Sequence, residues 1–155
     1  MAQRGSVTAV VGVPPDVVFQ LVTDVERLPE WNALITRVVE PLADCAPDRE
    51  WVVEMRAMGN SWHSRSRVLA YDATARRFSY RSCTDDGNPS YGVWNWQIDP
   101  DADSHGAHVV VSWELHPRTF WRRTLMAPMR NRQLRGEVRS SLHTAEQCLA
   151  PWERR

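Results

Sequence analysis

The C-terminal stretch of the chain, residues 119–150, is the one segment with the pattern of a long helix, and it constrains the fold more than any other feature. A helix has 3.6 residues per turn, so apolar residues in steps of three and four form one stripe along it. Pro128 lacks a backbone N–H and clashes with the preceding turn, which predicts a break or kink near Ala127. Such a helix cannot bury its stripe alone, so the rest of the chain is expected to wrap around it. The stripe consists of Leu134, Val138, Leu142, Ala145 and Leu149.

The chain before this helix consists of short runs of β-branched and aromatic residues separated by turn signals, which is typical of strands. Two short helices are expected after the first strand, over residues 17–24 and around Pro29 and Trp31. Six consecutive strands with short turns predict an antiparallel meander with one buried face. The fold class is therefore α+β, a curved sheet of about seven strands around the long helix, in a single domain over residues 1–155. The strands are expected at residues 5–13, 34–42, 50–58, 61–72, 77–84, 90–100 and 107–117.

Charge is distributed unevenly along the chain. Residues 1–117 carry 10 Arg against 16 Asp and Glu, a net charge of −6, whereas residues 118–155 carry 9 Arg against 3 Glu, a net charge of +6. A basic segment can contact phosphates or anionic lipid, but a solvated helix face is the commoner explanation. No nucleic-acid-binding module is recognisable, so no nucleic-acid partner is expected.

Several kinds of site lack the residues that they need. All 19 basic residues are arginine, which excludes Schiff-base chemistry through a lysine and a phosphate-binding P-loop. The three cysteines are far apart and in no CxxC pair, and His105 and His108 share a turn without a third ligand nearby. The sequence therefore predicts no cofactor and no metal.

The chain has no membrane-spanning pattern. No apolar run approaches the ~20 residues that a transmembrane helix requires, and residues 1–13 lack the features of a signal peptide. A cytoplasmic protein without stable membrane insertion is expected. The sequence leaves the oligomeric state open.

Three stretches carry a family resemblance: the opening SVTAVVGVPPDVVFQLVTDVERLPEWNALITRVVE, and the later WNWQIDP and HVVVSWELHP. With the order of its elements, the sequence resembles the helix-grip (START / SRPBCC) superfamily over residues 5–149, and the polyketide cyclase/dehydrase-like proteins most closely. The resemblance implies a helix-grip fold that encloses a hollow between sheet and helix. Members include cyclases, aromatases, lipid carriers, hormone receptors and chaperone activators, so the fold does not set the activity.

Alternation along each strand predicts which side chains face the helix. The predicted interior is rich in tryptophan, has small serines and almost no ionisable groups, which suits an apolar or aromatic ligand. The alternative is that the tryptophans simply fill the core; the resemblance favours a cavity. Ala70 is also expected to face inward. The expected ligand-binding residues are Trp31, Trp51, Val53, Met55, Trp62, Ser64, Ser66, Phe78, Ser82, Trp94, Trp96, Trp113, Asn131, Leu134 and Val138.

The resemblance also implies a chemistry, the intramolecular aldol cyclisation or dehydration of a poly-β-ketone. This requires a donor that polarises a carbonyl and a group that moves protons. Tyr80 is the one ionisable group that the expected interior strands offer. A one-residue slip in the strand from residue 61 would bring His63 and Arg67 inside as base and enolate stabiliser, and some aromatase/cyclases of this family do use an interior arginine on this strand. The charged set is expected outside, because an unpaired buried arginine is costly.

The predicted function is that of a polyketide cyclase/dehydrase-like protein. It would bind a hydrophobic, polycyclic or aromatic small molecule between sheet and C-terminal helix, and assist cyclisation through cavity shape, Tyr80 and, in the slipped register, Arg67 and His63. The main alternative is a non-catalytic carrier or sensor of a lipid or quinone-like ligand. A third is an interaction domain with a filled core.

Overall fold

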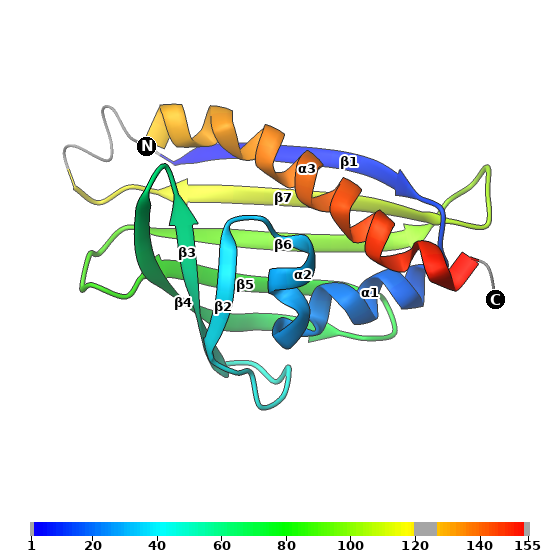
Figure 1. The fold of residues 1–155 in the computed structure, drawn as a ribbon, viewed down its shortest axis with the longest axis horizontal. Coiled ribbons are helices and arrows are strands. Elements are labelled where there is room, and N and C mark those ends of the chain that lie inside the picture. The colour runs from blue at the N-terminus through cyan, green and yellow to red at the C-terminus, as the bar shows by residue number, and fades with distance from the viewer. Residues whose placement is uncertain (1, 120–126, 154–155) are drawn as a thin grey trace.

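A seven-stranded antiparallel sheet forms the body of the protein, and one long helix crosses it (Figure 1). The computed structural model describes residues 2–119 and 127–153. The elements are β1 (Gln3–Val11), α1 (Pro15–Thr23), a 3-10 turn (Val25–Arg27), α2 (Leu28–Trp31), β2 (Ile35–Glu40), β3 (Glu50–Ala57), β4 (Asn60–Asp72), β5 (Arg77–Thr84), β6 (Tyr91–Pro100), β7 (Ala107–His116) and α3 (Ala127–Glu153). The strand order is β1-β7-β6-β5-β4-β3-β2, so β1 and β2 are the two edges. The predicted α+β helix-grip architecture is confirmed.

The long helix α3 packs on β1 and β7 and against α2, and Figure 1 shows it running diagonally across the sheet. All five residues of the predicted apolar stripe are buried. Pro128 lies in the first turn of α3, where a missing backbone N–H costs no intrahelical hydrogen bond. Pro128 is therefore the second residue of α3, which begins at Ala127. The part of the expected helix over residues 120–126 lies outside the described residues.

One face of the sheet, which we call the inner face, points toward the helices. The predicted alternation places the right residues on it, with one exception on β4. A register shift between Val68 and Ala70 adds a residue there, which reverses the faces beyond it. Ala70 is exposed, and the ring of Tyr71 instead lies 5.5 Å from that of Phe19 and 6.2 Å from that of Phe78. The expectation that Ala70 faces inward was therefore wrong.

The indole of Trp113 joins β7 to α3. Its Nε1–H donates to Asn131 Oδ1 at 2.8 Å, and Asn131 Nδ2 in turn donates to the Arg4 carbonyl at 3.2 Å. Gly5 pairs with Trp113 across the strands, and a Cβ at Gly5 would lie only 2.5 Å from Trp113 Cζ2. The absence of a side chain at Gly5 therefore lets the indole lie flat between strand and helix.

Gly5→Ala should destabilise the protein, because the new methyl group must displace the Trp113 ring. We expect a loss of about 1–3 kcal/mol in the free energy of unfolding, the range typical of overpacking. Urea unfolding measures it. Gly136→Ala on α3 is the control, since a Cβ there meets nothing within 4 Å and alanine favours a helix interior by roughly 0.5–1 kcal/mol. Equal effects of the two variants would contradict the packing described for Trp113.

Candidate functional site

A continuous group of aromatic rings covers the inner face, which we call the aromatic wall. Its members come from four strands: Trp51 of β3, Phe78 and Tyr80 of β5, Trp94 of β6 and Trp113 of β7. Neighbouring ring centroids lie between 5.0 and 6.5 Å apart, which is the range of favourable aromatic pairs. Trp96 also faces inward, with its ring edge-on to that of Trp31 at 5.9 Å. The sequence therefore placed its tryptophans on the correct face.

Burial changes along the inner face from one end to the other. At the end that α1 covers, most inner residues of β3 to β7 are buried, whereas Tyr71 is 39% exposed. At the opposite end, which is bounded by the β3–β4 turn, the loop of residues 85–90 and the end of β7, inner residues are partly exposed. We call this the open end. Its partly exposed inner residues are Met55, Trp62, Ser64, Tyr80, Ser82, Trp94 and Leu115.

Two serines lie beneath the aromatic rings on neighbouring strands. Ser66 and Ser82 pair across β4 and β5, and their Oγ atoms are 2.5 Å apart. Only one of the two protons is used in this contact, so the pair keeps one hydroxyl proton for another acceptor. Ser64 lies beside them in partial exposure. The expected polar floor of the site is therefore present.

Tyr80 lies in the middle of the aromatic wall. Burial raises the pKa of its hydroxyl to about 12, against the opposing effect of a hydrogen bond with the Trp96 indole. An indole N–H can only donate, so the Tyr80 oxygen is the acceptor in this contact. At neutral pH Tyr80 can therefore donate a hydrogen bond to a ligand oxygen, but it cannot act as a base.

Eight of the expected ligand contacts belong to the buried core: Trp31, Trp51, Val53, Phe78, Trp96, Trp113, Leu134 and Val138. The Trp31 Nε1 atom is buried without a hydrogen-bond partner among the described residues. Two small hollows flank α3, one of about 210 Å³ beside β1 and one of about 230 Å³ beside residues 33–34. Neither is lined by a residue of the aromatic wall or by any ligand contact predicted from the sequence, so neither hollow is the cavity expected between the sheet and the helix.

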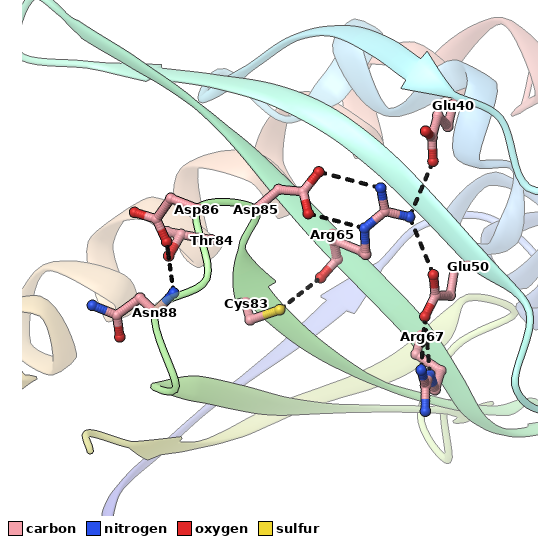
Figure 2. Close-up of polar contacts among 9 residues, drawn as sticks. All are labelled: Glu40, Glu50, Arg65, Arg67, Cys83, Thr84, Asp85, Asp86 and Asn88. Atoms are coloured by element: carbon pink, nitrogen blue, oxygen red, sulfur yellow. Dashed lines mark hydrogen bonds and ion pairs between the residues drawn. The ribbon is translucent and has the colours of Figure 1, made fainter. Parts of the chain in front are cut away.

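The charged residues of β4 lie on the outer face, where they form the ion-pair network of Figure 2. Arg65 Nη1 lies 3.1 Å from both Glu40 Oε2 and Glu50 Oε2, and its Nε donates to Asp85 Oδ1 at 3.0 Å. Arg67 Nη2 lies 2.9 Å from Glu50 Oε1. Carboxylates of β2, β3 and the residue after β5 thus neutralise both guanidinium groups outside the sheet.

The slipped register is therefore wrong, and with it the interior positions considered for Arg67 and His63. The His63 side chain is exposed, and its Nε2 lies 3.9 Å from the Glu54 carboxylate on the outer face. Trp62, Ser64 and Ser66 take the inner positions of this strand. Among the described inner positions of β3 to β7, the ionisable side chains are those of Tyr71 and Tyr80. Tyr71 was missed because a bulge leaves no signal in a single sequence.

Neither a metal centre nor a membrane span is found in the described part of the chain. No three His, Cys, Asp or Glu side chains within residues 2–119 and 127–153 are grouped so that they could hold a metal ion. None of the helices there is long and apolar enough to cross a bilayer.

Comparison with known proteins gives one family match and several structural likenesses. A family model described as polyketide cyclase / dehydrase and lipid transport matches residues 2–147. The Zhui aromatase/cyclase from Streptomyces sp. R1128 is similar with a TM-score of 0.74 and 15% identity, over 95% of this chain and 93% of that one. Ara h 8.0201 gives a TM-score of 0.75 and 14% identity, over 96% and 98% of the two chains.

A third similar structure is the di-domain ARO/CYC StfQ from the steffimycin biosynthetic pathway. Its TM-score is 0.76 at 12% identity, over 95% of this chain and 50% of that one. At 12–15% identity these three likenesses show the fold alone. No curated protein sequence matches the chain.

Replacing Arg65 by methionine should weaken the fold in a pH-dependent way. Hydrogen bonds from Arg67 and Arg65 lower the pKa of Glu50, and the hydrogen bond from Arg65 lowers that of Asp85. A carboxylate whose pKa is lowered by folding stabilises the native state above its unfolded pKa and loses that effect as the pH falls through its folded pKa. The deficit of Arg65→Met in unfolding free energy should thus be largest near neutral pH.

Urea unfolding of Arg65→Met and the parent between pH 7 and pH 3 measures this deficit, with Arg56→Met as a control on the neighbouring strand. Arg56 is exposed, and the described residues give it no ion pair. A deficit that stays constant as the carboxylates become protonated would show that the ion pairs do not cause it.

Proposed function

Because the chain belongs to the polyketide cyclase / dehydrase and lipid transport family, we propose that it binds a flat hydrophobic small molecule against the aromatic wall at its open end. The observation that carries this proposal is the aromatic surface at the open end, where Trp94 and Tyr80 are partly exposed although the Tyr80 hydroxyl itself is buried. The ring planes of Tyr80 and Trp94 are within 16° of parallel, so a planar ligand that stacks on one ring also lies nearly parallel to the other. Covering exposed aromatic surface contributes roughly 25 cal/mol per Å² buried.

The polar groups at the open end suggest a ligand that carries oxygen. The Tyr80 hydroxyl is protonated at neutral pH, and the Ser66–Ser82 contact uses only one of its two hydroxyl protons. Both face the inner side of the sheet, where a ligand carbonyl or hydroxyl would accept. An aromatic polyketide, a quinone or a lipid with a polar end fits these donors better than a pure hydrocarbon does.

For the reaction, we propose the cyclase/dehydrase class, with Tyr80 polarising a carbonyl of a poly-β-ketone. The wall would hold the flexible chain folded, and holding reacting atoms close contributes up to ~7–11 kcal/mol in favourable cases. Tyr80 can act as the acid, because its hydroxyl is protonated at neutral pH. Arg67 and His63 take no part in this scheme, since they lie on the outer face.

A second function, a non-catalytic carrier or sensor, is favoured by one specific observation. Enolate formation needs a base, and the described inner positions of β3 to β7 offer only the two tyrosines as ionisable groups. The raised pKa of Tyr80 makes it a poor base. A lipid or quinone-like ligand would then be bound and released unchanged. For either function, we also propose from the sequence that the protein acts in the cytoplasm.

Binding should be visible as a saturable quench of tryptophan fluorescence when a dihydroxyanthraquinone is titrated in. Tyr80→Phe should weaken binding of this probe by roughly three- to tenfold, the effect of one neutral hydrogen bond, and leave binding of anthracene, which has no oxygen, unchanged. Tyr91→Phe is the control, because its ring lies outside, stacked on His116. The absence of a saturable quench with both probes would overturn the binding proposal.

Turnover separates the enzyme from the carrier. With a linear poly-β-ketone analogue, mass spectrometry should detect a product that has lost water, and Tyr80→Phe should reduce kcat by on the order of 10²-fold, as expected for a lost acid. Binding without turnover would instead establish the carrier. Turnover that is unchanged in Tyr80→Phe would remove Tyr80 from the chemistry.

A further inference from the structure

The edge strand β1 has one side without a strand partner in the described part of the chain. It pairs with β7 over all nine residues without interruption, and the strand order ends there. No proline, bulge or lysine protects this edge, and Val10 is 52% exposed on its outer face. Proteins usually cover or charge such an edge, because its free N–H and C=O groups pair readily with another strand.

A groove runs beside this edge, between β1 and α3, with a volume of about 210 Å³. Residues 7–11 form one wall, and four residues of α3 form the other. The helix side carries Arg139 near one end of the groove and Glu146 near the other. The groove thus combines the free edge of β1, apolar side chains such as Val7 and Leu142, and two opposite charges on α3.

Arg139 and Glu146 have no ion pair within the described residues, although several other arginines form ion pairs with carboxylates. On the same helix, Arg130 and Glu137 have the same seven-residue spacing and do pair, at 2.6 Å. Seven residues of helix span about 10 Å, so Arg139 and Glu146 present a positive and a negative charge two turns apart. A partner with the reverse arrangement would neutralise both.

A second copy of this chain has that reverse arrangement when it is turned by a two-fold rotation. Ala9 is the middle residue of the strand side of the groove, and Leu142 and His143 lie midway between the two charges. A two-fold axis through these midpoints brings Arg139 against Glu146 of the second copy and Glu146 against its Arg139. The same rotation places Thr8 opposite Val10 in an antiparallel pair of β1 strands. A two-fold interface is self-complementary in this way.

We propose that two copies of this chain associate through the groove between β1 and α3, with antiparallel β1 strands joining the two sheets. The rotation places the exposed Val10 of each copy beside Thr8 of the other and gives both β1 edges a strand partner. Because the strands run in opposite directions, the two open ends point away from each other and stay free. The dimer therefore does not depend on the proposed ligand.

Charge reversal on α3 tests the arrangement directly, with the full chain in sedimentation equilibrium. Arg139→Glu places two acidic groups together at each end of the interface, and Glu146→Arg places two basic groups together. Each single variant should raise the dimer dissociation constant about tenfold or more, since like charges across an interface are strongly unfavourable. The double variant R139E/E146R restores both pairs and should return the constant to near the parent value.

Arg135→Glu is the matched control, since Arg135 is exposed on the same helix and outside the groove. It should leave the dissociation constant unchanged. Circular dichroism shows whether each variant is folded, and hydrogen exchange at the β1 amides should slow as the parent concentration rises. A parent that is monomeric throughout its soluble range would overturn the proposal, as would a dimer whose dissociation constant is unaffected by both single reversals.

Discussion

The packing of α3 onto one side of the curved sheet is the contact on which the rest of the structure depends. The apolar stripe from Leu134 to Leu149 is buried, and the Trp113–Asn131 hydrogen bond fixes the start of the helix above β7. Because α3 packs mainly on β1, β7 and α2, the side chains of β3 to β6 must fill the space beneath it. Large aromatic rings fill this space at the end that α1 covers, whereas at the open end they remain partly exposed.

The two faces of the sheet carry different kinds of side chain. The inner face holds indoles, phenols and hydroxyls, and the outer face holds arginines paired with carboxylates. A guanidinium on the inner face would lose its hydration without a carboxylate to compensate, while outside it ties neighbouring strands together. Among the described inner positions of β3 to β7, Tyr71 and Tyr80 are the ionisable groups, and a phenol is better suited to donating a hydrogen bond than to abstracting a proton.

The proposed ligand site and the proposed dimer interface lie on different sides of α3. The stripe that faces the sheet positions the aromatic wall, and the row formed by Arg139, His143 and Glu146 lies beside the free edge of β1. Leu142 belongs to both surfaces, but no residue of the aromatic wall lines the groove. A ligand at the open end and a second copy at the edge can therefore be present together, and each can be removed without the other.

The sequence by itself determined the elements, because local patterns decide them. The steps of three and four along α3, the alternation in each strand and the turn residues between strands predicted a curved antiparallel sheet around a long helix and most of the inner face, and the family resemblance added the helix-grip fold. The interior placement of Ser66, Tyr80 and Trp94 followed from alternation alone. Only the tertiary structure decided the rest: the bulge that turns Tyr71 toward Phe19 and Phe78, the carboxylates that hold Arg65 and Arg67 outside, and the open end. These depend on how strands shift and where a helix lies across them, which are long-range packing relations that no local pattern encodes.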